Sequence, residues 1–258
     1  MINKVTSISL GITCLGFSLF STPASAVNFT KFSDADVPSL SGWTDLGWKL
    51  EGRAGVKGYG DWEIGIGENT DPLTPTEQLT WDWDNGETVN WKLNWEGSTV
   101  NFTFDNRPEL SYTSTVDNSL NFDSFYLWTR ATTKTGKVAP HTEIYLEVTE
   151  FQELGAVNFT KVSNIFSSAT APESSDETDI TKNWFTSDRE IAALKGIVRM
   201  SWDENAVNPN QAKARSLIGF KIVGYDNNFE PTSVPEPSII LGLLSVSGAA
   251  LMQKRRSL

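Results

Sequence analysis

Residues 79–104 read LTWDWDNGETVNWKLNWEGSTVNFTF, and this stretch decides the fold class. Apolar residues occupy every second position in three runs and alternate with polar residues, which is the pattern of half-buried β-strands. The three runs span residues 79–83, 89–95 and 100–104. Asn85-Gly86 separates the first two runs and is a strong hairpin signal, since both residues tolerate positive φ. Gly97-Ser98 separates the second and third. We therefore predict a three-stranded antiparallel meander.

The rest of the chain predicts further short strands and almost no helix. The expected strands cover residues 43–50, 61–66, 122–130, 144–149, 197–202 and 217–225. Within 122–130, Phe125 and Leu127 fall on one face and Tyr126 and Trp128 on the other. Many short strands separated by turn signals predict an all-β fold, an antiparallel β-sandwich or jelly roll.

Two stretches interrupt this pattern. Ser187-x-x-Glu190 has the form of a capping box and is followed by IAAL and Gly196, so we expect a helix of about two turns there. The acidic stretch 167–179, SSATAPESSDETD, is typical of a flexible loop or linker.

The start of the chain predicts a secretory signal peptide. Residues 1–4 are weakly basic, residues 5–20 are apolar, and Ala24 and Ala26 supply the small-x-small pattern that a signal peptidase requires. Cleavage after Ala26 would make Val27 the first mature residue. The single cysteine, Cys14, lies in the apolar segment, so the translocated region has no disulfide to stabilise it.

The end of the chain combines a short proline motif, an apolar run and a basic tail. Pro235, Glu236 and Pro237 precede fifteen apolar or small residues, 238–252. As a helix this run would reach only about 22 Å, a short transmembrane span. The basic tail that follows resists translocation and is expected to stay in the cytoplasm. It consists of Lys254, Arg255 and Arg256.

This tail resembles a PEP-CTERM sorting signal. The resemblance rests on VPEPS, the Gly- and Ala-containing apolar run and KRR. It implies recognition and cleavage by an exosortase, a membrane protease, with the mature protein reaching the cell surface or the extracellular space. Proteins of this kind in cyanobacteria and other Gram-negative bacteria often carry a choice-of-anchor β-sandwich ectodomain, which the VNFTK, KGIVRMSW and IGFKIVGYD stretches resemble. An association with biofilm matrix and exopolysaccharide is implied by the tail alone.

These features divide the chain into a signal peptide (1–26), a Trp-rich β-sandwich ectodomain (27–233) and a sorting signal with its membrane helix (234–258). The ectodomain holds 17 basic and 31 acidic residues, a net charge of −14. This charge argues against nucleic acid as a partner, because its phosphates would be repelled. The expected partners are signal peptidase, an exosortase, exopolysaccharide and, before processing, the membrane.

Catalytic motifs are absent from the sequence. The one histidine, His141, stands in an expected loop, and no serine lies in a G-x-S-x-G turn. Two carboxylate pairs have a spacing that a glycoside hydrolase can use, Asp61 with Glu63 and Asp82 with Asp84. Residues 82–87 resemble a calcium loop but lack the EF-hand spacing. We expect no enzyme activity, no cofactor and no metal.

The ten tryptophans suggest a sugar-binding surface, because aromatic rings stack on sugar rings. Four of them share a face with Leu or Val and are expected in the core: Trp81, Trp83, Trp91 and Trp95. Three have less apolar company and are the expected exposed glycan contacts: Trp43, Trp48 and Trp62. The sequence therefore favours a structural or adhesive component of the envelope or matrix. The alternatives are a carbohydrate-binding module and, less favoured, a glycan hydrolase with an Asp/Glu pair.

Overall fold

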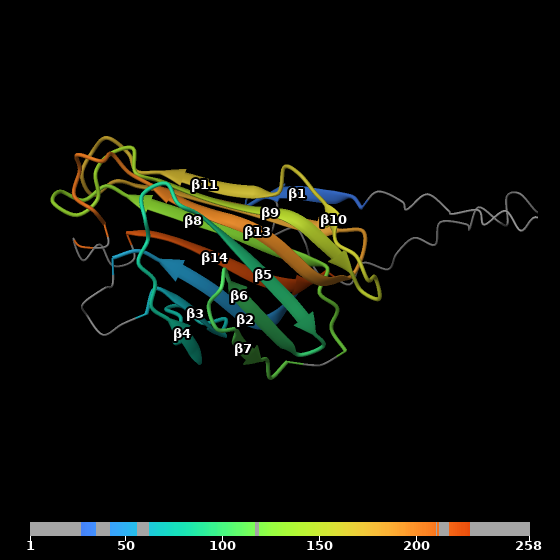
Figure 1. Ribbon diagram of the computed structural model, residues 1–258. Coiled ribbons are helices and arrows are strands. Elements are labelled where there is room, and N and C mark those ends of the chain that lie inside the picture. The colour runs from blue at the N-terminus through green and yellow to red at the C-terminus, as the bar shows by residue number, and fades with distance from the viewer. Residues whose placement is uncertain are drawn as a thin grey trace, which may run out of the picture.

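The computed structural model describes residues 27–34, 42–55, 62–116, 119–209, 211 and 217–227. Within these residues the protein is all-β, with strands in two antiparallel sheets (Figure 1). The predicted all-β, two-sheet fold is confirmed. Among the described residues, no helix is both long and apolar enough to cross a membrane. The predicted signal peptide and the predicted sorting signal lie outside the described residues.

In the part of the chain that the structure describes, each sheet has seven strands. Sheet A has the order β1 (Phe29–Ser33), β12 (Thr178–Ser187), β8 (Ser124–Thr132), β14 (Ile218–Asp226), β2 (Thr44–Arg53), β3 (Ile64–Glu68) and β4 (Glu77–Leu79). Sheet B has the order β10 (Thr160–Lys161), β9 (Glu143–Glu153), β13 (Ile191–Ser201), β5 (Thr88–Glu96), β6 (Thr99–Phe104) and β7 (Leu110–Thr113), with β11 (Phe166–Thr170) also paired to β9.

The core lies between the sheets and is built by the period-two alternation of their strands. Sheet A contributes residues such as Leu50, Leu127 and Phe220, and sheet B contributes Leu93 and Leu146, all fully buried in one cluster. The four tryptophans expected in the core are there, with exposed fractions of 8% or less. They are Trp81, Trp83, Trp91 and Trp95. Apolar burial on this scale can stabilise a domain that has no disulfide.

Two of the core indoles pack closely against glycines of neighbouring strands. A Cβ built on Gly196 would lie 2.3 Å from the Trp91 ring, and one on Gly224 would lie 2.3 Å from the Trp48 ring. Real Cβ atoms do not approach other atoms so closely. The glycines thus make room for side chains whose size would otherwise push the two sheets apart.

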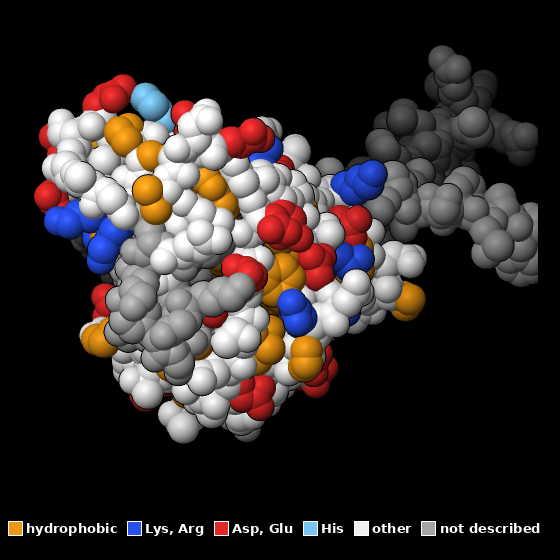
Figure 2. All heavy atoms as spheres, turned by 60° about the vertical axis from the view of Figure 1, so that its left-hand side comes forward, with side chains coloured by type: hydrophobic (Ala, Val, Ile, Leu, Met, Phe, Trp, Pro, Cys, Tyr) orange, Lys and Arg blue, Asp and Glu red, His pale blue; other side chains and the backbone are white. Residues whose placement is uncertain are grey.

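The molecular surface seen in Figure 2 is mixed. Hydrophobic side chains form small, separate spots there, with acidic and basic side chains between them. This is the ordinary pattern of a solvated surface, on which single apolar side chains need no partner.

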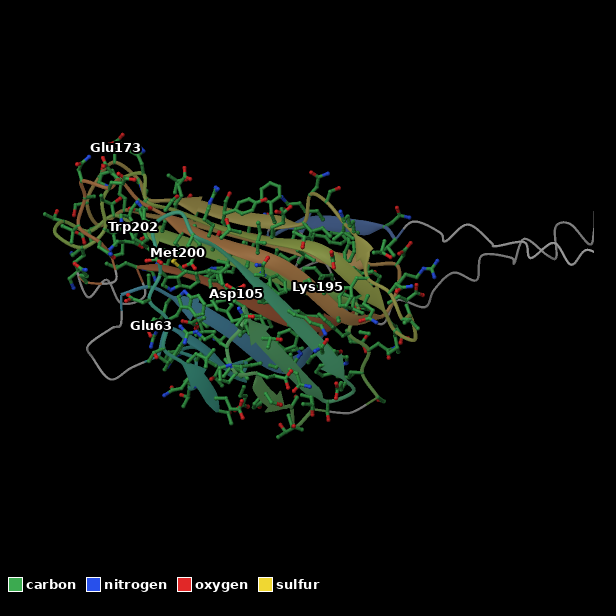
Figure 3. The ribbon with its side chains drawn as sticks, in the orientation of Figure 1. Glu63, Asp105, Glu173, Lys195, Met200 and Trp202 are labelled. Atoms are coloured by element: carbon green, nitrogen blue, oxygen red, sulfur yellow. The ribbon has the colours of Figure 1, made fainter. Side chains whose placement is uncertain are left out.

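The predicted meander is half right. The β5–β6 hairpin turns at Gly97-Ser98 as expected, and β7 rather than the 79–83 run is its third strand. Of the predicted 79–83 run only Leu79 is in a strand. It ends β4 (Glu77–Leu79), which pairs with β3 in the other sheet. Asn85-Gly86 therefore does not close a hairpin. It lies where the chain passes from sheet A to sheet B, beside Met200 at the end of β13 and Trp202 just after it (Figure 3).

The predicted helix after Ser187 is wrong. Ser187 Oγ accepts a hydrogen bond from the Arg189 backbone N–H, so the capping signal closes a turn between β12 and β13. The IAAL segment begins β13, where Leu194 pairs with Leu93 on β5 and with Phe151 on β9. Pairing on both sides in the sheet outweighs the local helix preference.

The predicted flexible linker is wrong at both ends. Residues 166–170 form β11, residues 178–187 form β12, and only 171–177 connect them. Ser167 is fully buried, and its hydroxyl contacts Thr129 Oγ1 at 2.9 Å and donates to the Thr181 carbonyl at 3.0 Å. Small hydroxyl side chains in this stretch let β11 approach β8 and β12 of the other sheet, which composition alone did not indicate.

Candidate functional site: an aromatic face on sheet A

The outer face of sheet A carries a row of large side chains on adjacent strands. Phe32, Trp184, Tyr126 and Val223 follow one another across β1, β12, β8 and β14, because each is the cross-strand partner of the next. Trp43 packs on this row just before β2. We call the following residues the aromatic face: Phe32, Trp43, Tyr126, Trp128, Trp184, Val223 and Tyr225.

The rings of the aromatic face contact one another edge-on or tilted. Trp184 has its ring centroid 4.9 Å from Tyr126, 5.1 Å from Tyr225 and 5.4 Å from Trp43. Trp184, Tyr126 and Val223 are buried. Phe32, Trp43, Trp128 and Tyr225 are only partly buried and form the accessible part. The face therefore has a packed layer on the sheet and rings that remain open to solvent.

A second row on the same face places Trp128 between two lysines. Lys182 on β12 and Lys221 on β14 are the cross-strand partners of Trp128. Lys221 Nζ lies 4.8 Å from the Trp128 ring centroid, and Lys182 Nζ lies 4.3 Å from that of Trp184. Cation–π attraction of this kind contributes about 0.5–2 kcal/mol and fixes the orientation of the rings.

A carboxylate accompanies each of these lysines. Asp34 Oδ1 accepts a hydrogen bond from Trp184 Nε1–H at 3.0 Å and lies 3.4 Å from Lys182 Nζ. The indole hydrogen bond, together with Lys182, keeps the pKa of Asp34 below its usual value. Asp34 is therefore an anion at neutral pH and adds an acceptor to the edge of the aromatic face.

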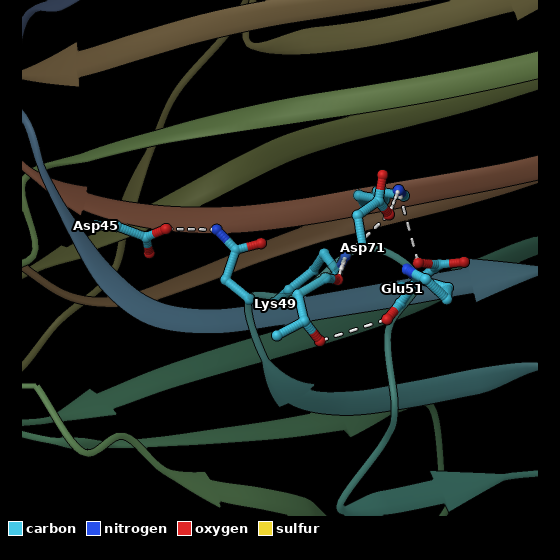
Figure 4. Close-up of polar contacts among 8 residues, drawn as sticks. Asp45, Lys49, Glu51 and Asp71 are labelled. Carbon is cyan, nitrogen blue, oxygen red and sulfur yellow. Dashed lines mark hydrogen bonds and ion pairs between the residues drawn. The ribbon is translucent and has the colours of Figure 1, made fainter.

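A charged network extends the face toward β2 (Figure 4). Lys221 Nζ lies 3.1 Å from Asp71 Oδ1 and 3.8 Å from Glu51 Oε2. Asp71 is also 3.4 Å from Lys49 Nζ, which donates to the Thr70 carbonyl. The hydrogen bond from Lys221 is the main cause that lowers the pKa of Asp71. Asp71 is largely exposed, so its second oxygen can accept a bond from a ligand.

Lys49 has a structural part in this network. Its side chain is 2% exposed, beneath residues 70–71. Burial, and then the charge of Lys221, lowers the pKa of Lys49. The buried ammonium holds the 69–72 segment against β2, because leaving it without a carbonyl or carboxylate partner would be costly.

The tyrosines of the face remain protonated. Burial raises the pKa of both Tyr126 and Tyr225 well above 10. Each hydroxyl is thus a neutral donor and acceptor at physiological pH. The aromatic face combines flat apolar rings with neutral hydroxyls, ammonium donors and carboxylate acceptors.

Only one of the three predicted exposed tryptophans lies on this face. Trp43 is part of it. The prediction is wrong for Trp48, which is fully buried on the inner face against Trp95 and Phe122. It is also wrong for Trp62, which is 7% exposed and lies under the Arg53 guanidinium, 3.7 Å from the ring centroid. Neither residue has an apolar neighbour in the sequence: Trp48 lies between Gly47 and Lys49, and Trp62 lies between Asp61 and Glu63.

The candidate hydrolase pairs do not meet at a site that the structure describes. Glu63 is 1% exposed, and its Oε2 accepts a hydrogen bond from the Trp81 backbone N–H at 3.2 Å. Asp61 lies outside the described residues. Asp82 and Asp84 are exposed on the crossover segment, not on a strand as predicted.

His141 lies in an exposed loop, as predicted, with Nε2 2.9 Å from Glu173 Oε1. Across the described ranges, no three His, Cys, Asp or Glu side chains gather as metal ligands would. Pro235, Glu236, Pro237, Lys254, Arg255, Arg256, Ala24 and Ala26 lie outside the described residues.

Sequence reasoning missed most of the aromatic face. A usable signal was present, because the alternation in 122–130 already separates Tyr126 and Trp128 from the core residues Phe125 and Leu127. The same alternation in β12 separates Lys182 and Trp184 from Phe185. Two neighbouring strands with outward-facing aromatic and basic residues would have marked this face.

The comparisons with known proteins add no family or relative. No family model matches the chain, and no curated protein matches it.

Proposed function

We propose that this protein is exported, sorted by an exosortase and retained at or near the cell surface, where its sandwich adheres to matrix polysaccharide through the aromatic face. One observation carries the adhesive part. Partly exposed rings on adjacent strands lie beside paired lysines and carboxylates on a broad sheet face. Flat rings bordered by donors and acceptors are the chemistry that holds sugar rings and their hydroxyls.

Trp128 is the central contact in this proposal. It is only partly buried, its cross-strand partners are Lys182 and Lys221, and the Lys221 ammonium lies 4.8 Å from its ring centroid. A sugar ring stacked there would have Asp34 and Asp71 beyond the two lysines as acceptors. An aromatic contact contributes on the order of 1 kcal/mol, so several adjacent rings are needed for useful affinity.

Export and sorting rest on the two ends of the chain. The n-region, the apolar segment and Ala24-x-Ala26 support signal peptide removal, and the VPEPS segment with its basic tail supports exosortase processing. The glycan hydrolase alternative has less support, because Glu63 is buried and hydrogen-bonded to the backbone, while Asp82 and Asp84 lie in solvent.

Affinity electrophoresis of the full chain tests the adhesive part. Native gels would contain a neutral glucan, a mannan or a uronate-rich polysaccharide. We expect at least one of these polysaccharides to retard the folded protein. Heat-unfolded protein should have the same mobility in gels with and without polysaccharide. Equal mobility of the folded protein in all gels would contradict the proposal. An acidic protein of matched charge controls for electrostatic retardation.

A further inference from the structure

A small polar pocket lies on the opposite outer face of the sandwich, across β11, β9 and β13 of sheet B. Its volume is about 180 Å³. Two cross-strand rows form it: Ser168, Tyr145 and Arg199 in one, and Thr170, Glu143 and Ser201 in the other. All six residues are on the strands themselves, so the sheet fixes their relative positions.

One wall of the pocket is an aromatic ring held in place. The Tyr145 ring stacks on Phe166 with centroids 5.6 Å apart and ring planes 26° from parallel. Tyr145 is partly exposed, and burial together with Glu147 raises its pKa to about 12. The hydroxyl is therefore neutral, and its oxygen can accept a hydrogen bond from a ligand.

The remaining groups of the pocket are complementary to a polyhydroxy ligand. Arg199 is exposed and forms no ion pair with any residue that the structure describes, so its donors are open to a ligand. Glu143 offers an exposed carboxylate, and Ser168, Thr170 and Ser201 offer hydroxyls. Drug-sized ligands occupy pockets of roughly 300–1,000 Å³, so this one has room for a single ring-sized group.

We propose that this pocket is a second glycan contact, which makes the sandwich bivalent. This inference rests on the proposed function. The aromatic face and the pocket are on the outer faces of different sheets, with the core between them. Two stacked sheets are about 10 Å apart, and a polysaccharide lying on one face cannot reach the other without wrapping around the sandwich. Binding at both faces therefore bridges two glycan chains.

Bridging is measured separately from binding. The full chain is titrated into a dilute solution of the polysaccharide that retards it, and light scattering reports bridged chains. Scattering should rise, pass a maximum and fall when excess protein occupies every chain singly, as expected for a bivalent linker. Protein alone at the same concentrations controls for self-association.

Substitutions in the pocket test whether it is the second binding site. Arg199→Gln and Tyr145→Ala should still be retarded in the gel but should give no more than about a tenth of the wild-type rise in scattering. Lys161→Gln, an exposed residue at the edge of the same sheet, should behave as wild type. Wild-type bridging by folded Arg199→Gln and Tyr145→Ala would overturn the inference, as would retardation of the wild type without bridging. Failure of the wild type to bind any polysaccharide would instead overturn the proposed function.

Discussion

Asn85 and Trp202 exchange two hydrogen bonds although 117 residues separate them in the sequence. Asn85 Nδ2–H donates to the Trp202 carbonyl at 2.8 Å, and the Trp202 backbone N–H donates to Asn85 Oδ1 at 2.8 Å. The Gly86 N–H donates to the Met200 carbonyl at 2.9 Å. The side-chain amide of Asn85 thus pairs with the end of β13 as another strand would, and it anchors the crossover between the sheets.

Asn85→Asp should destabilise the protein at neutral pH. The substitution removes the Nδ2–H donor and places a carboxylate against the Trp202 carbonyl, so we expect a loss of about 1–3 kcal/mol in the free energy of unfolding. Urea denaturation followed by tryptophan fluorescence measures it. Asn94→Asp, on the outer face of β5, is the matched control. Equal midpoints for wild type and Asn85→Asp would contradict the anchoring role.

Gly196→Ala should be among the most harmful single-methyl additions in this chain. The new Cβ would lie 1.9 Å from the Glu147 carbonyl oxygen and 2.3 Å from the Trp91 ring, so β13 must shift or the indole must leave its place. We expect a loss of about 3 kcal/mol or more, or failure to fold. A Cβ built on Gly136 would have no atom within 4 Å other than those of its chain neighbours. Gly136→Ala should therefore cost only the positive-φ strain of about 1–2 kcal/mol. Similar thermal midpoints for the two variants would rule out this packing account.

Asp123 should make the protein more stable as the pH falls from 7 to 4. Burial raises its folded-state pKa to about 6, against 3.8 for an exposed aspartate, and the neighbouring Asp226 and Glu190 act in the same direction. The folded state therefore binds the proton more tightly than the unfolded chain. The stabilisation on protonation is fully present below about pH 4 and is lost as the pH rises through 6.

The matched variant is Asp123→Asn, whose amide oxygen can still accept the bonds from Ser124 Oγ–H and the Asn227 backbone N–H. It should raise the free energy of unfolding at pH 8 by on the order of 2 kcal/mol and flatten the profile between pH 4 and 7. Denaturation at a series of pH values gives both curves. A wild-type free energy of unfolding that decreases as the pH falls from 7 to 4 would be inconsistent with a raised pKa of Asp123.

The sorting signal is tested in cells that contain an exosortase. Replacing Pro235, Glu236 and Pro237 by alanine should leave a membrane-held precursor after signal peptide removal, because two prolines preset an extended segment with few backbone donors for the protease. Deleting residues 238–258 should yield a soluble periplasmic protein. Immunoblots of membrane, periplasmic and external fractions distinguish these products. Normal export of the alanine variant would contradict recognition of this motif by the protease.

The sequence predicted the fold class well and the connections poorly. Period-two alternation identified β2, β5, β6, β8, β9 and β14, because a strand with one buried face must alternate. The hairpin predicted at Asn85-Gly86 and the helix predicted after Ser187 were wrong because both predictions used local signals alone. Whether a turn closes a hairpin or a crossover depends on partners such as Trp202, far along the chain.

The candidate site was harder to predict than the core. Trp48 lies between Gly47 and Lys49 in the sequence, with no apolar neighbour, and only the structure shows that Gly224 leaves space for its indole inside the sandwich. Conversely, Trp128 and Trp184 follow ordinary strand alternation. They form one face because β8 and β12 are neighbours in the sheet, a pairing that alternation alone does not specify.

Stability and binding should separate within the aromatic face. Trp184 is 4% exposed beneath Trp43, so Trp184→Ala should lose about 3–5 kcal/mol of stability, as a large core truncation does. Trp128 is partly exposed, so Trp128→Ala should leave the protein folded. A large loss of stability in Trp184→Ala but not in Trp128→Ala would distinguish the packed rings from the rings that are open to a ligand.

The most direct test of the adhesive face is the dissociation constant of Trp128→Ala for the polysaccharide that retards the wild type. Isothermal titration of the full chain with short fragments of that polysaccharide should show affinity weakened about five-fold or more, since one aromatic contact contributes about 1 kcal/mol. The thermal midpoint should stay within about 3 °C of wild type. An unchanged dissociation constant in a folded Trp128→Ala protein would contradict the claim that the aromatic face of sheet A binds the glycan.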